Sequence, residues 1–307
     1  MLLLQQMTVM LLMMIIGFIC FKTGLITTET NQKLSGMVVN IANPALILSA
    51  SICSDGYIAG EELLQVVLLA ILVYAILLLL GELVVRILRI PKESHGSYCA
   101  MLVFSNIGFM GFPIISALYG SSALLYASIF LIPYNLLIYT YGIRAMASEE
   151  TRQNQKGQKI QWKKIFNIGV IACIITIVIY LAEIPMPAFV VSTVQNLSNL
   201  TAPLSMMVIG ASLATIRFKE LFTDGKLLIF SGIKLLLIPI LGVLLIKQVI
   251  SNEVILGVCM IMLATPVGSM TAMLAQDTGG DYELATRGVT LTTILSVATV
   301  PIVSLFL

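Results

Sequence analysis

Two short stretches of this sequence combine helix-breaking residues with small polar side chains inside apolar runs. The first, NIGFMGFP, contains Asn106, Gly108, Gly111 and Pro113. The second, TPVGSMT, contains Thr265, Pro266, Gly268, Ser269 and Thr271. Proline removes a backbone donor and glycine permits unusual backbone angles, so both stretches predict interrupted helices, with half-helices beginning near Pro113 and Pro266. A helix N-terminus carries partial positive charge, so two that point to one place would suit an anion. The alternative is a pair of packing kinks that bind nothing.

Two further polar residues lie beside predicted helix breaks. Asn43 directly precedes Pro44, and Ser205 follows Pro203 by two residues. Such side chains can bind substrate oxygens without the cost of a permanent charge. The competing interpretation is interhelical hydrogen bonding, which is common between membrane helices. We expect Asn43 and Ser205 to contribute to a substrate site together with the two interrupted stretches.

Charged residues inside the apolar runs are scarce. Lys234, in SGIKLLLIPI, is the clearest case. A charge in hydrocarbon costs about 2.5–3.5 kcal/mol on the insertion scale, which predicts a partner, a water-filled cavity or an anion beside it. Snorkelling of the side chain to the membrane interface is the alternative. Glu82 and Arg86 have the spacing of a local ion pair, although Glu82 is also a candidate for ion coupling. Asp277 closes an apolar run and is expected to face water, where it could titrate.

Composition restricts the class of protein. Of 307 residues, 59% are hydrophobic and 10% are charged, and the mean hydropathy is +1.03. These values exclude a soluble globular enzyme. A net charge of +2 provides no basic surface for nucleic acid. One histidine and five scattered cysteines predict no metal site and no disulfide framework. The motifs H-E-x-x-H, G-x-S-x-G and G-x-x-x-x-G-K-[ST] are absent, so we expect neither an enzyme nor a cofactor.

The apolar runs must supply the elements that position these residues. Since an open sheet cannot satisfy its backbone in lipid, all of them should be helices, and the fold class is an all-α polytopic membrane protein. The N-terminal run lacks a basic n-region and is interpreted as a retained span. Ten spans are predicted, at residues 3–21, 34–53, 63–88, 97–119, 123–145, 165–184, 188–214, 227–250, 253–275 and 285–307.

The longest polar stretch divides these spans into two sets of five. Residues 1–147 form the first predicted repeat, 148–164 a cytoplasmic polar loop, and 165–307 the second repeat. An odd number of spans turns the second repeat upside down relative to the first, which is the arrangement of an inverted repeat. Basic residues concentrate in the loops after odd-numbered spans, so both termini are expected outside the cell.

Five segments together resemble the auxin efflux carrier family over essentially the whole chain. They are NPALILSAS (43–51), NIGFMGFP (106–113), PLSMMVIGASLA (203–214), KLLLIP (234–239) and the long stretch 264–302. The resemblance implies two inverted five-helix repeats whose broken helices 4 and 9 cross at Pro113 and Pro266, as in the NhaA antiporter and the bile-acid symporters. It also implies a scaffold of spans 1, 2, 6 and 7, often dimeric, and a transport part of spans 3–5 and 8–10. The short central loop is similar to that of bacterial members.

The resulting functional hypothesis is a secondary transporter that moves a small organic anion by elevator-type alternating access. The family's substrates imply an auxin-like molecule or a dicarboxylate such as malate or malonate. The expected surroundings are the bacterial plasma membrane and a homodimer through the scaffold. Two alternatives stay open: a sodium-coupled symporter of the bile-acid type, and a membrane sensor that binds a ligand without moving it. Substrate identity, direction and coupling ion are not determined by the sequence.

Overall fold

The computed structural model describes residues 2–53, 60–148, 151, 165–215 and 221–307. Throughout these residues the regular structure is helical, which confirms the all-α class. Their only β-type pairing is one isolated antiparallel bridge, between Ser105 and Val267. The predicted cytoplasmic loop 148–164 lies outside the described residues, apart from Ser148 and Thr151.

The helices follow one another along the chain, and several are joined end to end by π-helical turns, labelled η. They are α1 (Leu2–Lys22), α2 (Thr28–Met37), η1 (Val38–Ala42), α3 (Asn43–Ile52), α4 (Gly60–Ile87), α5 (Lys92–Val103), η2 (Ile107–Gly111), α6 (Phe112–Tyr119), α7 (Ala123–Leu137), η3 (Ile138–Gly142), α8 (Ile143–Met146), α11 (Ile168–Leu181), α12 (Ala188–Asn199), α13 (Thr201–Leu213), α15 (Gly225–Gly232), η4 (Ile233–Leu237), α16 (Ile238–Ile246), α17 (Glu253–Ala264), α18 (Ser269–Asp277) and α19 (Tyr282–Ser304).

Six of the described helical stretches are long and apolar enough to cross a membrane. They are Leu4–Lys22, Thr28–Ile52, Gly60–Ile87, Ala123–Met146, Gly225–Ile246 and Tyr282–Ser304. The other four predicted spans take different forms. Spans 97–119, 188–214 and 253–275 are each divided between two shorter helices, and 165–184 contains the 14-residue helix α11.

Prolines account for the position of three π-turns. Pro44, Pro113 and Pro239 each occupy the second residue of the α-helix that follows a π-turn. Proline lacks an N–H and its ring collides with the carbonyl one turn earlier, and a wider turn relieves that collision. The helix therefore continues through these prolines instead of ending at them.

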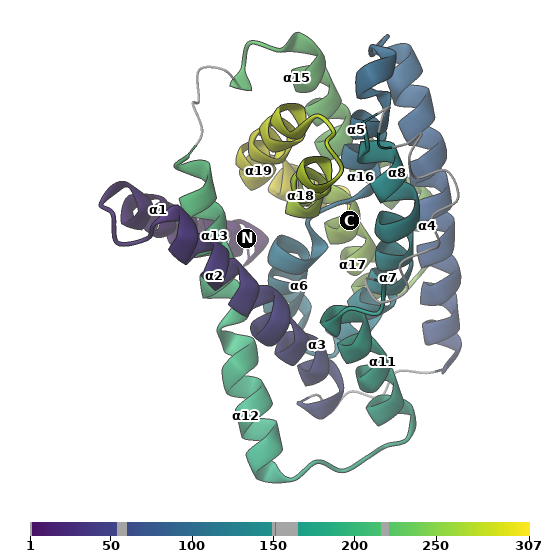
Figure 1. Ribbon diagram of the computed structural model, residues 1–307. Coiled ribbons are helices and arrows are strands. Elements are labelled where there is room, and N and C mark those ends of the chain that lie inside the picture. Colours follow the sequence, from purple (N-terminus) through teal and green to yellow (C-terminus); the bar gives the residue numbers. More distant parts are fainter. Residues whose placement is uncertain (1, 54–59, 149–150, 152–164, 216–220) are drawn as a thin grey trace.

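The most extensive helix packing joins segments that are far apart in the sequence. Helix α1 packs along α13, α3 packs against α11 and α12, and α4 packs against α5 and α7. In Figure 1, α1, α2, α12 and α13 lie on one side of the molecule and α4 lies on the other. Helices α1 and α13 approach closely at Gly210, where an added Cβ would be 1.9 Å from the Met14 carbonyl oxygen.

The outward faces of the long helices are apolar. Large hydrophobic side chains are exposed along α1 and α4, including Leu12, Ile16, Leu68 and Leu79. In water such faces would drive aggregation, whereas in a bilayer they contact lipid tails. The polar residues of interest lie instead on the inward faces, where the helices meet.

Candidate functional site

Two non-helical segments lie side by side in the interior of the protein. The first, residues 104–106, separates α5 from η2, and the second, residues 265–268, separates α17 from α18. The Asn106 N–H donates to the Pro266 carbonyl oxygen (2.7 Å), and the Gly268 N–H donates to the Phe104 carbonyl oxygen (2.8 Å). Non-helical backbone at membrane depth must be satisfied by protein or water. Here the two interruptions satisfy each other.

The first interruption lies earlier in the chain than the sequence predicts. Helical structure resumes at Ile107, so Gly108 and Gly111 lie within η2 and Pro113 lies within α6. The expected half-helix start near Pro113 is therefore wrong, because the π-turn absorbs that proline. The restart is fixed by Asn106, whose Oδ1 accepts a hydrogen bond from the Phe109 N–H (3.4 Å). This is the geometry of an N-cap.

The second interruption lies where the sequence predicts it. Helix α17 ends at Ala264, Thr265 is its C-cap, and α18 begins at Ser269. Gly268 permits the close approach of the two segments: an added Cβ would lie 3.0 Å from the Ser105 carbonyl oxygen and 3.2 Å from that of Phe104. The site therefore joins two helix C-termini to two helix N-termini, which carry partial charges of opposite sign.

Lys234 places its side-chain amino group beside the first interruption. It lies in η4 with a side chain that is 1% exposed, so snorkelling to the interface is wrong. Its Nζ donates to the carbonyl oxygen of Leu102 (2.9 Å) and to Ser105 Oγ (2.5 Å). Leu102 belongs to the last turn of α5, where a cation is favourable. No described carboxylate forms an ion pair with this ammonium group.

Hydroxyl groups line the second interruption. Thr265 Oγ1 donates to the Met262 carbonyl oxygen (3.2 Å), and Thr271 Oγ1 donates to that of Gly268 (2.7 Å). Ser269 is half-buried at the first position of α18. Both threonine oxygens keep lone pairs that can accept a hydrogen bond from a ligand.

Two residues that contribute to the paired interruptions were not predicted from the sequence. Ser105 binds Lys234, and the Thr292 hydroxyl of α19 accepts the Val267 N–H (3.1 Å). Ser105 directly precedes Asn106, which was the only available signal for it. Thr292 carries no local signal, because its contact joins residues that are distant in sequence.

Asn43 and Ser205 belong to helices that contact η2, the helical turn that follows the first interruption. Asn43, at the start of α3, places its amide nitrogen 3.1 Å from the position of an added Cβ at Gly108 in η2. Ser205 is buried on α13, which packs against η1 and η2. The oxygens Asn43 Oδ1 and Ser205 Oγ have no hydrogen-bond partner among the described residues.

Glu82 and Asp277, the two acidic residues predicted as candidates for ion coupling, lie away from the interrupted segments. Glu82 is exposed on α4, and its Oε1 accepts from Cys99 Sγ (3.8 Å). The ion pair predicted between Glu82 and Arg86 is wrong, since no such contact occurs between these two described residues. Asp277 is exposed at the end of α18. Neither carboxylate contacts the interrupted segments. Among the described residues no cluster of His, Cys, Asp or Glu suits a metal ion.

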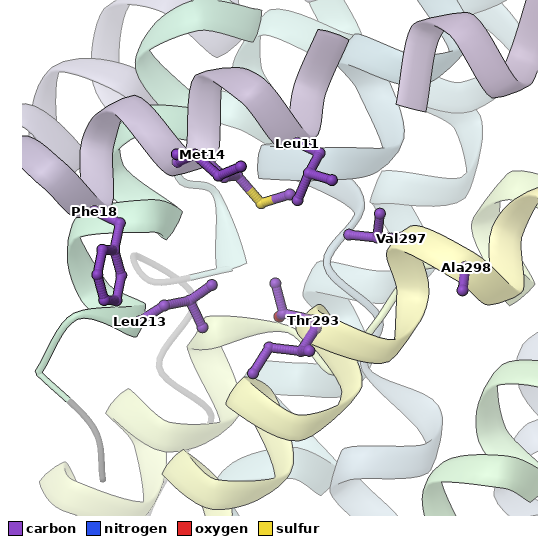
Figure 2. Close-up of a pocket in the computed structure, with 9 residues that line it drawn as sticks. Leu11, Met14, Phe18, Leu213, Thr293, Val297 and Ala298 are labelled. Atoms are coloured by element: carbon purple, nitrogen blue, oxygen red, sulfur yellow. The ribbon is translucent and has the colours of Figure 1, made fainter. Parts of the chain in front are cut away.

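An apolar pocket of about 370 Å³ opens between α1, α13 and α19 (Figure 2). Its lining is Leu11, Met14, Ile15, Phe18, Leu213, Thr293, Ile294, Val297 and Ala298. The Thr293 hydroxyl donates to the Val289 carbonyl oxygen of its own helix (2.7 Å). The pocket therefore offers apolar contact and no charged group.

The long apolar helices, their lipid-compatible outer faces and the interrupted helices inside define an integral membrane protein of the transporter class. A model of the membrane transport protein family matches residues 2–304, and the chain belongs to this family, the auxin efflux carriers, as its motifs indicate. An uncharacterized transporter of Methanothermobacter thermautotrophicus is 22% identical over 299 residues, which cover 97% of this chain and 96% of that protein. An uncharacterized transporter of Methanocaldococcus jannaschii is 24% identical over 217 residues, covering 67% of each chain.

Proposed function

We propose that this protein is a secondary carrier for a small organic anion and that the paired interruptions form its binding centre. The observation that carries the proposal is the buried Lys234 ammonium group, whose two partners are neutral oxygens. A buried charge is costly without a counter-charge. A carboxylate docked at the interruptions would supply one.

The remaining groups of the centre suit the same ligand. The helices that begin at Ile107 and Ser269 present N-terminal N–H groups of the kind that bind carboxylates. Asn106 and Thr271 add side-chain groups at those two helix starts. The ligand is then held by one full charge and by dipoles whose orientation is set by the backbone pairing.

We further propose that the chain is organised as an inverted repeat and that transport proceeds by elevator-type alternating access. In that organisation spans 1, 2, 6 and 7 form the scaffold, which also mediates a homodimer, and spans 3–5 and 8–10 move. One helix in each half of the chain is interrupted by a non-helical segment, at residues 104–106 and at 265–268, and α1 packs closely on α13; both observations support this division. The protein would reside in the bacterial plasma membrane with both termini outside and the segment 148–164 inside.

Uptake into proteoliposomes tests the proposal. Labelled malate, malonate and indole-3-acetate are offered in turn under a pH gradient, a sodium gradient and a potassium-diffusion potential. Saturable uptake of one anion is the expected result, and the effective gradient identifies the coupling. Asn106→Ala should lower that uptake without lowering the amount of folded protein. Flux that never saturates would instead indicate a channel, and binding without uptake would indicate a sensor.

A further inference from the structure

Among the described residues, three buried side-chain oxygens on α3 and α13 have no hydrogen-bond partner. They are Asn43 Oδ1, Thr201 Oγ1 and Ser205 Oγ, and each residue is more than nine-tenths buried. Neighbouring hydroxyls behave differently: Ser198 Oγ donates to the Gln195 carbonyl oxygen (2.9 Å) and Ser212 Oγ to that of Val208 (2.9 Å). Buried polar groups without partners are rare and costly. Because these three oxygens belong to two helical stretches that pack on each other, this region is a candidate site for a polar group of a ligand.

Helix packing brings these oxygens to one place. The stretch α2–η1–α3 runs antiparallel to α12–α13, since α2 contacts α13 while α3 contacts α12. Asn31 Nδ2 donates to Ser212 Oγ (2.9 Å), which fixes the register. Two helical turns after Asn31 the chain reaches η1, and two turns before Ser212 it reaches Ser205, so η1 lies opposite Ser205. One further turn in the same two directions brings the start of α3 opposite Thr201. Asn43 itself abuts Gly108 of η2, and α13 packs against both η1 and η2, so the three residues belong to the region where α3 and α13 approach η2.

The chemistry of these atoms restricts the ligand. An amide oxygen only accepts hydrogen bonds, and an ionised carboxylate has no proton to donate. A bare carboxylate therefore cannot satisfy Asn43 Oδ1, whereas a hydroxyl group donates one hydrogen bond and accepts others. A substrate with a hydroxyl beside its carboxylate would place the carboxylate at the interruptions and the hydroxyl at this cluster.

We propose that Asn43, Thr201 and Ser205 recognise a hydroxyl group of the substrate, which makes the preferred substrate class the hydroxycarboxylates. This inference rests on the proposed function, because it assigns the substrate class of the same site. A site that hydrogen-bonds a substrate hydroxyl discriminates strongly against the analogue lacking it, since its own polar groups are then left unpaired.

Matched substrate pairs test the inference in proteoliposomes. L-Malate is compared with succinate, and L-lactate with propionate, since the members of each pair differ by one hydroxyl. The wild-type protein should show a preference of at least about tenfold in kcat/KM for the hydroxylated member. Ser205→Ala and Thr201→Val should each reduce that preference by at least about threefold. Ser198→Ala, which removes a buried hydroxyl that already has a partner, should keep the preference.

The possible results separate the inference from the proposed function. Equal uptake of both members of a pair by the wild-type protein overturns the hydroxyl assignment and leaves the anion carrier standing. A hydroxyl preference that survives in both Ser205→Ala and Thr201→Val also overturns it. Uptake of none of the four acids by folded protein that does take up malonate or indole-3-acetate overturns this inference alone, whereas uptake of none of these six anions overturns the proposed function as well.

Discussion

Replacing Lys234 by methionine tests whether its ammonium group balances the charge of the transported anion. Methionine has a similar length and no charge, so the variant removes the two hydrogen bonds to Leu102 and Ser105 without opening a large cavity. Hydrogen bonds to a charged group contribute about 1.5–3 kcal/mol each. The cost of burying an ammonium group, several kcal/mol, disappears at the same time. These effects oppose each other, so the variant is expected to fold.

The effect on transport should be much larger than the effect on stability. For a carboxylate roughly 6 Å from the ammonium nitrogen and an effective dielectric constant of about 20, the lost attraction is about 2.8 kcal/mol. That corresponds to a decrease of about 100-fold in kcat/KM. Initial uptake rates at several anion concentrations provide the measurement, normalised to folded protein from size-exclusion chromatography.

A second lysine provides the control. Lys247 follows the other end of the same helical stretch and is exposed. Lys247→Met changes the formal charge equally but should leave uptake within about twofold, since an exposed charge is screened. If folded Lys234→Met transports the anion within about threefold of the wild-type rate, the proposed role of the ammonium group is refuted.

Three other substitutions test the packing around the site. Gly210→Ala places a Cβ against the backbone of α1 and should lower the melting temperature in detergent, whereas Gly36→Ala, which meets nothing within 4 Å, should not. Gly268→Ala presses on the Ser105 carbonyl oxygen and should destabilise the protein by about 1–3 kcal/mol and slow uptake; unchanged unfolding would contradict the close approach. Asn106→Ala removes an N-cap worth about 1 kcal/mol and should reduce uptake by more than this small loss of stability explains.

Much of the helical architecture can be predicted from the sequence because its cause is local. Apolar runs of span length predict helices whatever their neighbours, and the interruption at Pro266 lies where proline and glycine predict it. Lys234 was recognisable as unusual from its apolar surroundings alone. Its partners were not, because neither a backbone carbonyl nor a serine hydroxyl has a distinctive sequence signal.

The proposed role of Thr201 and Ser205 could not be predicted from the sequence for a different reason. Thr201 and Ser205 have the same residue types as the many serines and threonines that bond to their own helix. What distinguishes them is the absence of a partner among the described residues, which depends on how α13 lies against η1 and η2. Only the three-dimensional arrangement separates them from Ser198 and Ser212.

The position of the first interruption shows why local helix propensity is insufficient. Pro113 is the strongest helix breaker in its segment, yet the helix passes through it, while the interruption occurs at Phe104–Asn106, where no proline or glycine is present. The Phe104 carbonyl and the Asn106 N–H find their partners on Gly268 and Pro266 instead of in a continued helix. Gly268 allows that approach because an added Cβ would crowd the opposite backbone. The breakers of the second stretch thus determine where the first helix opens, and the two interruptions have to form together.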